Sequence, residues 1–389
     1  MGGVIALLSG YSLAKLALVY PSRGGIIEFL VQEFGENYFS GALSVIFYFV
    51  QLVTLAAVAK SFGEYGARLF GTHSTFAINS IAIGIILFFM IINLFGATFV
   101  AKSENLIVTI KLTALSIFTI AAFFTINPYY LDLSKAPPFI NAIFAIGLTF
   151  FAYQGYNSVI TNAIEDMENP KEILKAMFIA IGVVTLLYVS ISIAVIGNLP
   201  LSEVIKAKDY ALAEAAKPIF GELGFKIMAI VALISATSAI NATLYAATEI
   251  SYTLAKKGEL PKAYEYNVFN SYEGLIISTA LIIPMILFFN LSEITNVAAL
   301  SVLIIQALVH FGHIKLTPKT KANKPIIVFA FLLMSLVIIA TLYYNAKKDP
   351  KIILYLIAGF IIAFIMELIL RKFFGKRIKK QIKGEKWTK

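Results

Sequence analysis

A run of small and polar residues interrupts an apolar stretch between residues 139 and 163. The run, Gly147 to Ser158, places tyrosine, glutamine and asparagine in the middle of a segment long enough to cross a membrane. Non-helical backbone at that depth is tolerated only beside protein or a water-filled cavity. Freed amides and carbonyls there can bind the carboxylate and the amine of a zwitterion. The alternative is a kinked helix that uses Gly147 and Gly155 for close packing.

Lys111 places an ionisable amine inside another apolar stretch. It lies seven residues beyond Glu104, which corresponds to a depth of about 10 Å along a helix. A charged amine at this depth is costly unless it is paired, and ionisable residues within membrane helices commonly mark ion or proton pathways. A lysine that faces a cavity is suited to carrying a proton. The alternative is a structural lysine whose stem reaches toward the membrane surface.

The other ionisable residues in apolar stretches have simpler interpretations. Glu249 lies one to two turns from a basic loop, which favours a carboxylate at the membrane interface. Glu367 and Arg371 have the spacing of an ion pair on one helix face. His310 and His313 have no third ligand nearby, and the chain has no cysteine, so neither a metal site nor a disulfide is predicted. Enzyme and nucleotide-binding motifs are also absent from the sequence, which predicts neither an enzyme nor a cofactor.

The composition requires a membrane. Of the 389 residues, 59% are hydrophobic and 14% are charged, and the mean hydropathy is +0.84. Apolar runs of about 20 residues can cross a hydrocarbon core of roughly 30 Å. The polar stretch 201–219 instead predicts a helix that lies on the membrane surface. The predicted fold is an all-α polytopic membrane protein with eleven spans, at residues 2–19, 39–62, 76–97, 104–126, 139–163, 173–197, 223–254, 274–290, 293–312, 325–344 and 351–370.

A basic tail orients the chain. Residues 371–389 contain nine lysines and arginines and one acidic residue, and the loops on the tail's side hold 20 basic residues against 8 on the other side. Because cytoplasmic segments are enriched in basic residues, we expect the tail to be cytoplasmic and the protein to lie in the cell membrane. Nucleic-acid binding by the tail is the weaker alternative. Eleven spans then place Met1 outside, and we expect a further helix to be missing before it.

Four stretches, taken in order along the chain, are similar to the amino acid–polyamine–organocation transporter superfamily, and most of all to its proton-coupled amino-acid members. The first resembles the second helix of the family and the loop after it. The next two resemble the unwound sixth helix and the acidic Asn-Pro loop that follows it, and the last resembles the loop after the eighth helix. The stretches are Tyr11–Leu16 with Pro21–Gly25, Phe150–Tyr156, Glu165–Lys171 and Leu254–Pro261.

The resemblance implies a single transmembrane domain, residues 1–389, with the fold of two inverted five-helix repeats and two further helices. The eleven spans then correspond to family helices two to twelve, so the first family helix is absent. Its glycine-rich segment would bind the substrate carboxylate. The implied parts are the remainder of the first repeat at 1–126, the second repeat at 139–312, two further helices at 325–370 and the basic tail at 371–389.

The resemblance also implies roles for individual residues. Phe151 falls where family members place an aromatic gate over the substrate. Ala152, Tyr153 and Gly155 fall at the unwound backbone that contacts the substrate amine. Lys111 falls in family helix five, where some sodium-independent members carry a lysine in the place at which relatives bind sodium, and it is implied to couple transport to protons. One departure is the asparagine at position 157, where many members have a glutamate.

The functional hypothesis is therefore a secondary active transporter of amino acids, proton-coupled and working by alternating access. With no acidic residue near the predicted break, small neutral amino acids are favoured over cationic ones. The alternative is a transport-inactive homologue, or a chain whose start is wrongly assigned. An enzyme or a channel has no supporting residues, because the predicted spans carry almost no charge.

Overall fold

Long helices form almost all of the chain that the computed structural model describes, which is residues 1–374 without 23, 96–97, 133, 135–137 and 157–168. A β hairpin of β1 (Asn267–Val268) and β2 (Ser271–Tyr272) and two 3-10 turns, Pro128–Leu131 and Lys262–Glu265, complete the description. The helices are α1 (Gly2–Val19), α2 (Ile26–Phe34), α3 (Tyr38–Leu69), α4 (Thr75–Phe95), α5 (Thr98–Phe124), α6 (Phe139–Phe151), α8 (Glu172–Asn198), α9 (Leu201–Lys206), α10 (Ala211–Glu214), α11 (Lys217–Lys257), α12 (Glu273–Phe288), α13 (Leu291–Thr320), α14 (Lys324–Lys348) and α15 (Lys351–Phe374).

The predicted spans correspond closely to these helices. Within the described ranges, nine helices are long and apolar enough to cross a membrane, and α6 and α12 are shorter apolar helices. Each of the eleven predicted spans coincides with one of these eleven helices, although the length of α6 and α12 leaves nine rather than eleven of full spanning length. The predicted all-α architecture is confirmed.

Local sequence signals place several helix boundaries. Asn37 and Ser40 form a reciprocal capping box at the start of α3, in which each side chain accepts a hydrogen bond from the backbone amide of the other residue. Asn290 and Glu293 form the same motif at the start of α13. A capping box satisfies amides that a helix start leaves without partners. It therefore allows α13 to begin only three residues after the end of α12, in a tight hairpin.

The stretch 201–219 differs from its prediction. It forms two short helices, α9 and α10, and α11 begins within it at Lys217 rather than after it. The reason is packing: Ala213 and its neighbouring alanines are buried against Phe118 and Phe225, so the chain turns back toward α5 and α11 instead of continuing along the surface. A glycine at position 221, with φ of 67°, absorbs the change of direction inside α11.

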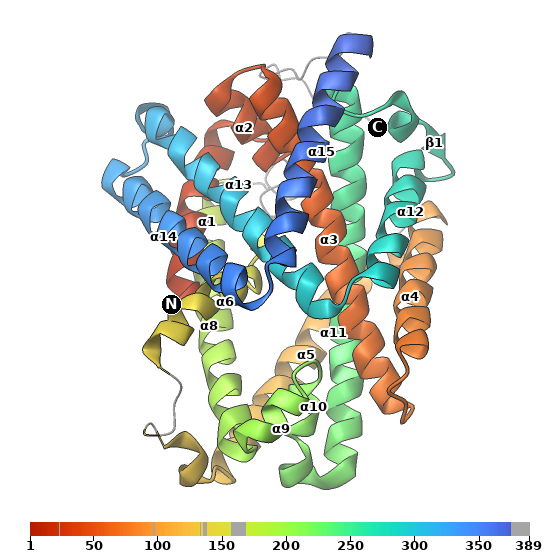
Figure 1. Ribbon diagram of the computed structural model, residues 1–389, viewed down its shortest axis with the longest axis vertical. Coiled ribbons are helices and arrows are strands. Elements are labelled where there is room, and N and C mark those ends of the chain that lie inside the picture. The colour runs from red at the N-terminus through yellow and green to blue at the C-terminus, as the bar shows by residue number, and fades with distance from the viewer. Residues whose placement is uncertain (23, 96–97, 133, 135–137, 157–168, 375–389) are drawn as a thin grey trace.

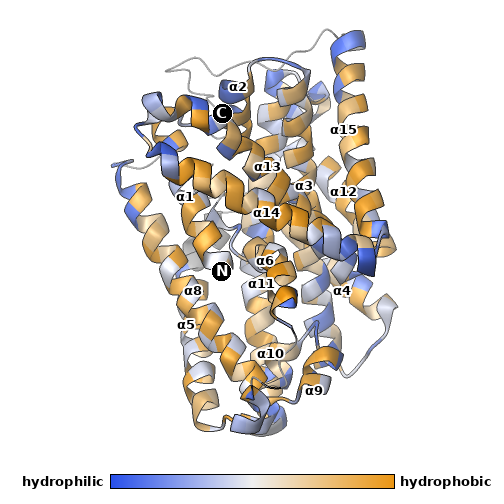
Figure 2. Ribbon diagram, turned by 60° about the vertical axis from the view of Figure 1, so that its left-hand side comes forward, coloured by the Kyte–Doolittle hydropathy of each residue, from blue (hydrophilic) through white to orange (hydrophobic). Residues whose placement is uncertain are grey.

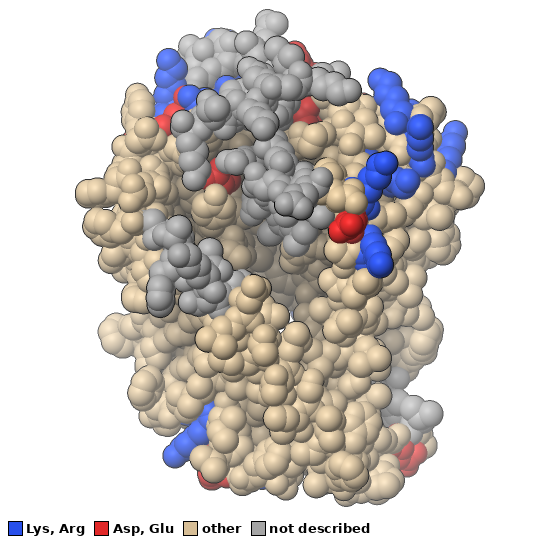
Figure 3. All heavy atoms as spheres, turned by 180° about the vertical axis from the view of Figure 1, so that it is seen from behind, with Lys and Arg blue, Asp and Glu red and all other residues tan. Residues whose placement is uncertain are grey.

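The helices divide into an inner and an outer group. α1, α3 and α13 are largely buried, whereas fewer than a third of the residues in the most apolar stretch of α4, α5, α8, α14 and α15 are buried. The outer helices are mainly hydrophobic along their length (Figure 2). On the face shown in Figure 3, the charged side chains of the described residues lie in the upper half and at the lower end, and a band between them shows no charged side chain. This is the distribution expected when a lipid bilayer surrounds the middle of the bundle.

The two ends of the bundle carry different elements. α2 and the end of α15 lie at the upper end in Figure 1, and α9 and α10 lie at the lower end. α6 reaches only part of the way through, and it packs against α1, α13 and α14. The end of α6 therefore lies inside the bundle, close to its most buried helices.

Candidate functional site

The helix break predicted from the sequence is present. α6 ends at Phe151, and the next four residues form turns. The amide of Tyr153 donates to the carbonyl of Phe150 at 3.0 Å, and the amide of Gln154 donates to that of Phe151 at 3.2 Å. These are tight bonds across three residues rather than the four-residue bonds of an α-helix. The second half of the predicted span, from Asn157, lies outside the described residues.

The residues of the break are exposed to different degrees. Phe151 and Tyr153 are half-buried, whereas Ala152 and Gly155 are exposed. A Cβ added to Gly155 would meet no atom of the described residues within 4 Å. The predicted site residues of this segment therefore lie together, with open space beside the backbone of Gly155. Gly147 differs, because a Cβ there would lie 2.5 Å from Oγ1 of Thr341, so the close-packing interpretation holds at that position.

Tyr188 of α8 contacts the break at Ala152 and Tyr153. Its hydroxyl donates to the carbonyl of Ala152 at 3.1 Å, and its ring packs edge-on against that of Tyr153 at 5.2 Å between centroids. The sequence analysis missed this residue. The available signal was weak: a single tyrosine in an otherwise apolar span.

Gln306 of α13 anchors the break from within the bundle. Its amide nitrogen donates to the side-chain oxygen of Gln154 at 2.7 Å, and its amide oxygen accepts from the hydroxyl of Tyr156 at 3.0 Å. Gln306 is completely buried. The sequence analysis missed it too, although it is the one glutamine in the predicted span 293–312.

Lys111 lies apart from the break. It is half-buried on α5, between the exposed residues Ile110 and Leu112. Among the described residues it forms no ion pair or hydrogen bond, with the break or elsewhere. α5 packs along α8, which also carries Tyr188. α8 is therefore the element that lies against both the lysine helix and the break.

The other ionisable residues considered in the sequence are the Glu367–Arg371 pair, Glu249 and the two histidines. The predicted ion pair is confirmed, with 2.9 Å between Nη2 of Arg371 and Oε1 of Glu367. The side chain of Glu249 is buried within the bundle, and its predicted place at the membrane interface stays a prediction. His310 and His313 are also buried, and both rings are hydrogen-bonded to hydroxyl groups. No cluster of potential metal ligands occurs among the described residues.

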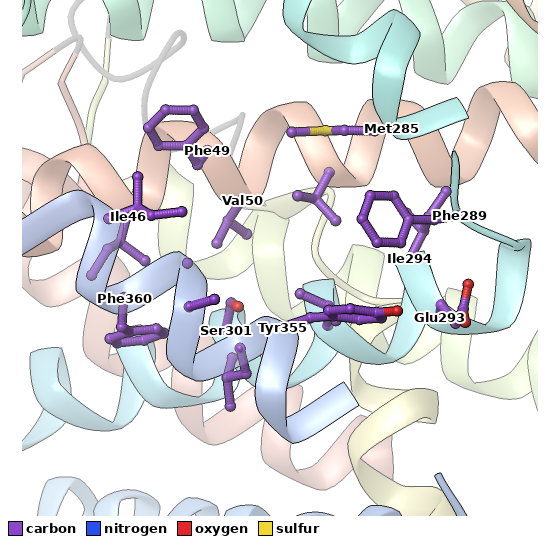
Figure 4. Close-up of a pocket in the computed structure, with 16 residues that line it drawn as sticks. Ile46, Phe49, Val50, Met285, Phe289, Glu293, Ile294, Ser301, Tyr355 and Phe360 are labelled. Atoms are coloured by element: carbon purple, nitrogen blue, oxygen red, sulfur yellow. The ribbon is translucent and has the colours of Figure 1, made fainter. Parts of the chain in front are cut away.

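A separate cavity of about 360 Å³ lies between α3, α12, α13 and α15. Figure 4 shows that large apolar side chains surround it, with the carboxylate of Glu293, the hydroxyl of Ser301 and the hydroxyl of Tyr355 as its few polar groups. None of the break residues lines it. Such a lining suits hydrocarbon better than a zwitterion, whose two charges would lose their water without gaining partners.

Comparison with known proteins gives one consistent family. A family model described as amino acid permease matches residues 1–367. The chain is 39% identical over 376 residues to an uncharacterized protein of Methanocaldococcus jannaschii, covering 96% of this chain and 86% of the relative. It is 33% identical over 376 residues to the inner membrane transport protein YbaT of Escherichia coli, covering 95% and 87%. It is 24% identical over 334 residues to the serine/threonine exchanger SteT of Bacillus subtilis, covering 83% and 75%.

Proposed function

Because this chain belongs to the amino acid permease family of the amino acid–polyamine–organocation superfamily, we propose that it is a secondary active transporter. It carries amino acids across the cell membrane by alternating access, and protons drive it. The single observation that carries the proposal is the open turn from Ala152 to Gly155, within a bundle whose other described helices are mostly continuous.

The substrate binds at this turn. The backbone there has left the helical hydrogen-bond pattern: the amides of Tyr153 and Gln154 form three-residue bonds, and Tyr188 binds the carbonyl of Ala152. The amide of Gly155 would pair with the substrate carboxylate, and the other carbonyls of the turn with its amine. Phe151 and Tyr153 supply apolar surface beside these groups, and Tyr188 fixes the carbonyl of Ala152. A small neutral amino acid fits this lining, because no acidic side chain of the described residues is hydrogen-bonded to the turn.

Two repeats move around the turn. We assign residues 1–126 to the first repeat, 139–312 to the second and 325–370 to two further helices, with the basic tail 371–389 in the cytoplasm. The break and its anchors come from α6, α8 and α13, which all belong to the second repeat in this assignment. A rocking motion between the repeats would open the turn to one side of the membrane and then to the other.

Lys111 couples the movement to protons. It lies on a helix of the first repeat that packs against α8, so its charge acts at the boundary between the repeats. An amine that has no ion-pair partner in the described residues can bind and release a proton without breaking a salt bridge. Its charge would favour one arrangement of the repeats and its loss the other.

The direct test is uptake of labelled amino acids by the full chain in liposomes. A panel of small neutral, acidic and cationic amino acids is offered singly and then as competitors. We expect uptake of small neutral amino acids, and competition among them. Folded, membrane-inserted protein that transports no amino acid would contradict the proposal and favour a transport-inactive homologue.

A further inference from the structure

A line of seven polar side chains runs through the interior of the bundle between α1 and α13. Each member is hydrogen-bonded to the next, and all but the first are buried. The line begins at the helix break and ends at the last residue of α13. Its members are Gln154, Gln306, Ser9, His310, Ser12, His313 and Thr320.

The part nearest the break contains one histidine. The hydroxyl of Ser9 donates to the amide oxygen of Gln306 at 2.6 Å. Nε2 of His310 lies 3.1 Å from the same hydroxyl oxygen. Because that hydroxyl already donates to Gln306, it accepts from His310, which therefore carries its hydrogen on Nε2.

The remaining part contains the second histidine. Nδ1 of His310 lies 3.0 Å from the hydroxyl of Ser12, and Nδ1 of His313 lies 2.8 Å from that hydroxyl. Nε2 of His313 lies 2.8 Å from the hydroxyl of Thr320. With His310 protonated on Nε2, Ser12 donates to it, His313 donates to Ser12, and Thr320 donates to His313. One set of tautomers satisfies every bond of the line, with the hydroxyl proton of Thr320 directed to His313 rather than to the carbonyl of Leu316, which lies 3.2 Å from the same hydroxyl.

The line covers roughly half of a membrane. Gln306 and Thr320 are fourteen residues apart on one helix, or about 21 Å at the rise of an α-helix. Lys321, directly after Thr320, is exposed. The line therefore connects the middle of the bundle, where α6 breaks, with the exposed end of α13.

Few charged or titratable side chains lie near the imidazole rings of His310 and His313. From α2, Glu33 lies against α13 at Gly312, where a Cβ would be 2.6 Å from its Oε2. After α6, Tyr156 is bound to Gln306. Lys315 and Lys319 of α13 itself are exposed. Among the described residues of all elements packed against α13, no charged side chain forms an ion pair with either histidine.

We propose that this line is a proton path, with His310 as the proton-binding residue, loaded from the end of α13 through Thr320, His313 and Ser12. The inference rests on the proposed proton-coupled transport and adds a second protonatable site to Lys111. Histidine is the side chain that binds and releases protons most readily near neutral pH.

The proton transfer conserves atoms and charge, and it needs only protons to move along the existing hydrogen bonds. The hydroxyl proton of Thr320 passes to Nε2 of His313 and is replaced by the excess proton of a hydronium ion, which becomes water. The Nδ1 proton of His313 passes to Ser12, and the hydroxyl proton of Ser12 passes to Nδ1 of His310. His310 is then an imidazolium that donates to both serines. His313 is neutral with its hydrogen on Nε2, and it accepts from Ser12.

The charge on His310 would be felt at the substrate turn. It lies one helical turn from Gln306, and Ser9 is bound to both. Gln306 in turn holds Gln154 and Tyr156 at the break. Protonation strengthens the bond from His310 to Ser9, because charge-assisted hydrogen bonds are the stronger ones. Proton binding and the position of the break are thereby linked.

The test separates substrate movement from proton movement. The full chain is placed in liposomes, and each variant is assayed for exchange of labelled against unlabelled amino acid without a gradient, and for accumulation driven by a pH gradient. The variants are Ser12→Ala, which removes the link between the rings, and His310→Gln. Ser44→Ala is the matched control, because Ser44 is equally buried and its hydroxyl donates to the carbonyl of Ser40 on its own helix.

We expect Ser12→Ala and His310→Gln to retain exchange and to lose about tenfold or more of the gradient-driven accumulation. Ser44→Ala should keep both activities. If His310→Gln loses exchange through misfolding, Thr320→Val, which keeps the shape of the side chain at the entry of the path, should show the same separation. Gradient-driven accumulation at the wild-type level in Ser12→Ala and Thr320→Val would overturn the proton path but leave the proposed proton coupling intact. A wild-type protein that ignores the pH gradient would overturn both the path and the proposed proton coupling.

Discussion

The amide nitrogen of Gln306 donates to the side-chain oxygen of Gln154 at 2.7 Å, joining the middle of α13 to the interruption of α6. The two residues are 152 positions apart. A buried side chain on a continuous helix thus holds the segment at which α6 ends and the backbone leaves the helix. The open turn is thereby kept in a defined shape inside the membrane region.

Removing this anchor should affect both stability and transport. Gln306→Ala leaves Tyr156 and Ser9 without their acceptor and Gln154 without its donor, and a buried polar group without a partner costs about 1–3 kcal/mol. We expect a lower unfolding temperature in detergent and a raised KM for uptake. Asn345→Ala is the control, since the amide of Asn345 is also buried but donates to its own helix. Equal effects of the two changes on KM would contradict the anchoring role.

The hydroxyl of Tyr188 should matter more than its ring. Tyr188→Phe keeps the packing against Tyr153 but removes the bond to the carbonyl of Ala152. A hydrogen bond of this kind contributes about 1 kcal/mol, so we expect a rise of about fivefold in KM and little change in unfolding temperature. Kinetics of Tyr188→Phe that match the wild type would show that the carbonyl is not positioned by this bond.

Glu33 should make the protein less stable as the pH rises. Both of its carboxylate oxygens are buried and have no hydrogen-bond partner among the described residues. Burial raises the pKa of this carboxyl well above its usual range. Above the ordinary carboxyl pKa the unfolded chain loses this proton while the folded chain keeps it. Stability then falls by at most about 1.4 kcal/mol per pH unit until the pH exceeds the raised pKa.

Unfolding temperatures of the wild type and Glu33→Gln between pH 5 and pH 8 test this. The variant should be the more stable of the two at pH 8, and the difference should shrink toward pH 5. Glu203→Gln, at an exposed glutamate of α9, should not alter the pH dependence. A difference between Glu33→Gln and the wild type that is the same at every pH would contradict the assignment.

Close packing between α3 and α4 depends on a glycine. A Cβ at Gly63 would lie 2.3 Å from the backbone oxygen of Ile78, so Gly63→Ala must move one helix away from the other. Overpacking of this kind costs about 1–3 kcal/mol. Gly84→Ala, where a Cβ meets no described atom within 4 Å, is the control and should not destabilise. Thermal unfolding that ranks Gly84→Ala below Gly63→Ala would contradict this packing.

The sequence predicted the features that depend on neighbouring residues. Long apolar runs located the helices, and the polar run after Phe151 located the break, because both are properties of one segment in lipid. The ion pair between Glu367 and Arg371 was equally local. The prediction of one helix over residues 201–219 was wrong, because the alanines of this stretch are buried against α5 and α11, and that contact arises only in the folded structure.

The site's anchors could not be predicted for the same reason. Ser9 and Gln306 are 297 residues apart, and only the packing of α1 against α13 brings them together. His310 and His313 have the spacing of a pair of metal ligands, but the sequence offers no third ligand near them. Their actual partners are hydroxyl groups, two of them on α1, which no spacing rule within one helix can identify.

Accumulation of a labelled neutral amino acid in liposomes under an imposed pH gradient tests the central claim most directly. We predict accumulation against the substrate gradient when the outside is acid, without any requirement for sodium, and its loss when a protonophore is added. Lys111→Ala should abolish this accumulation and retain exchange, while Lys226→Ala, at an exposed lysine of α11, should keep both. Accumulation that requires sodium, or that persists fully in Lys111→Ala, would contradict proton coupling through Lys111.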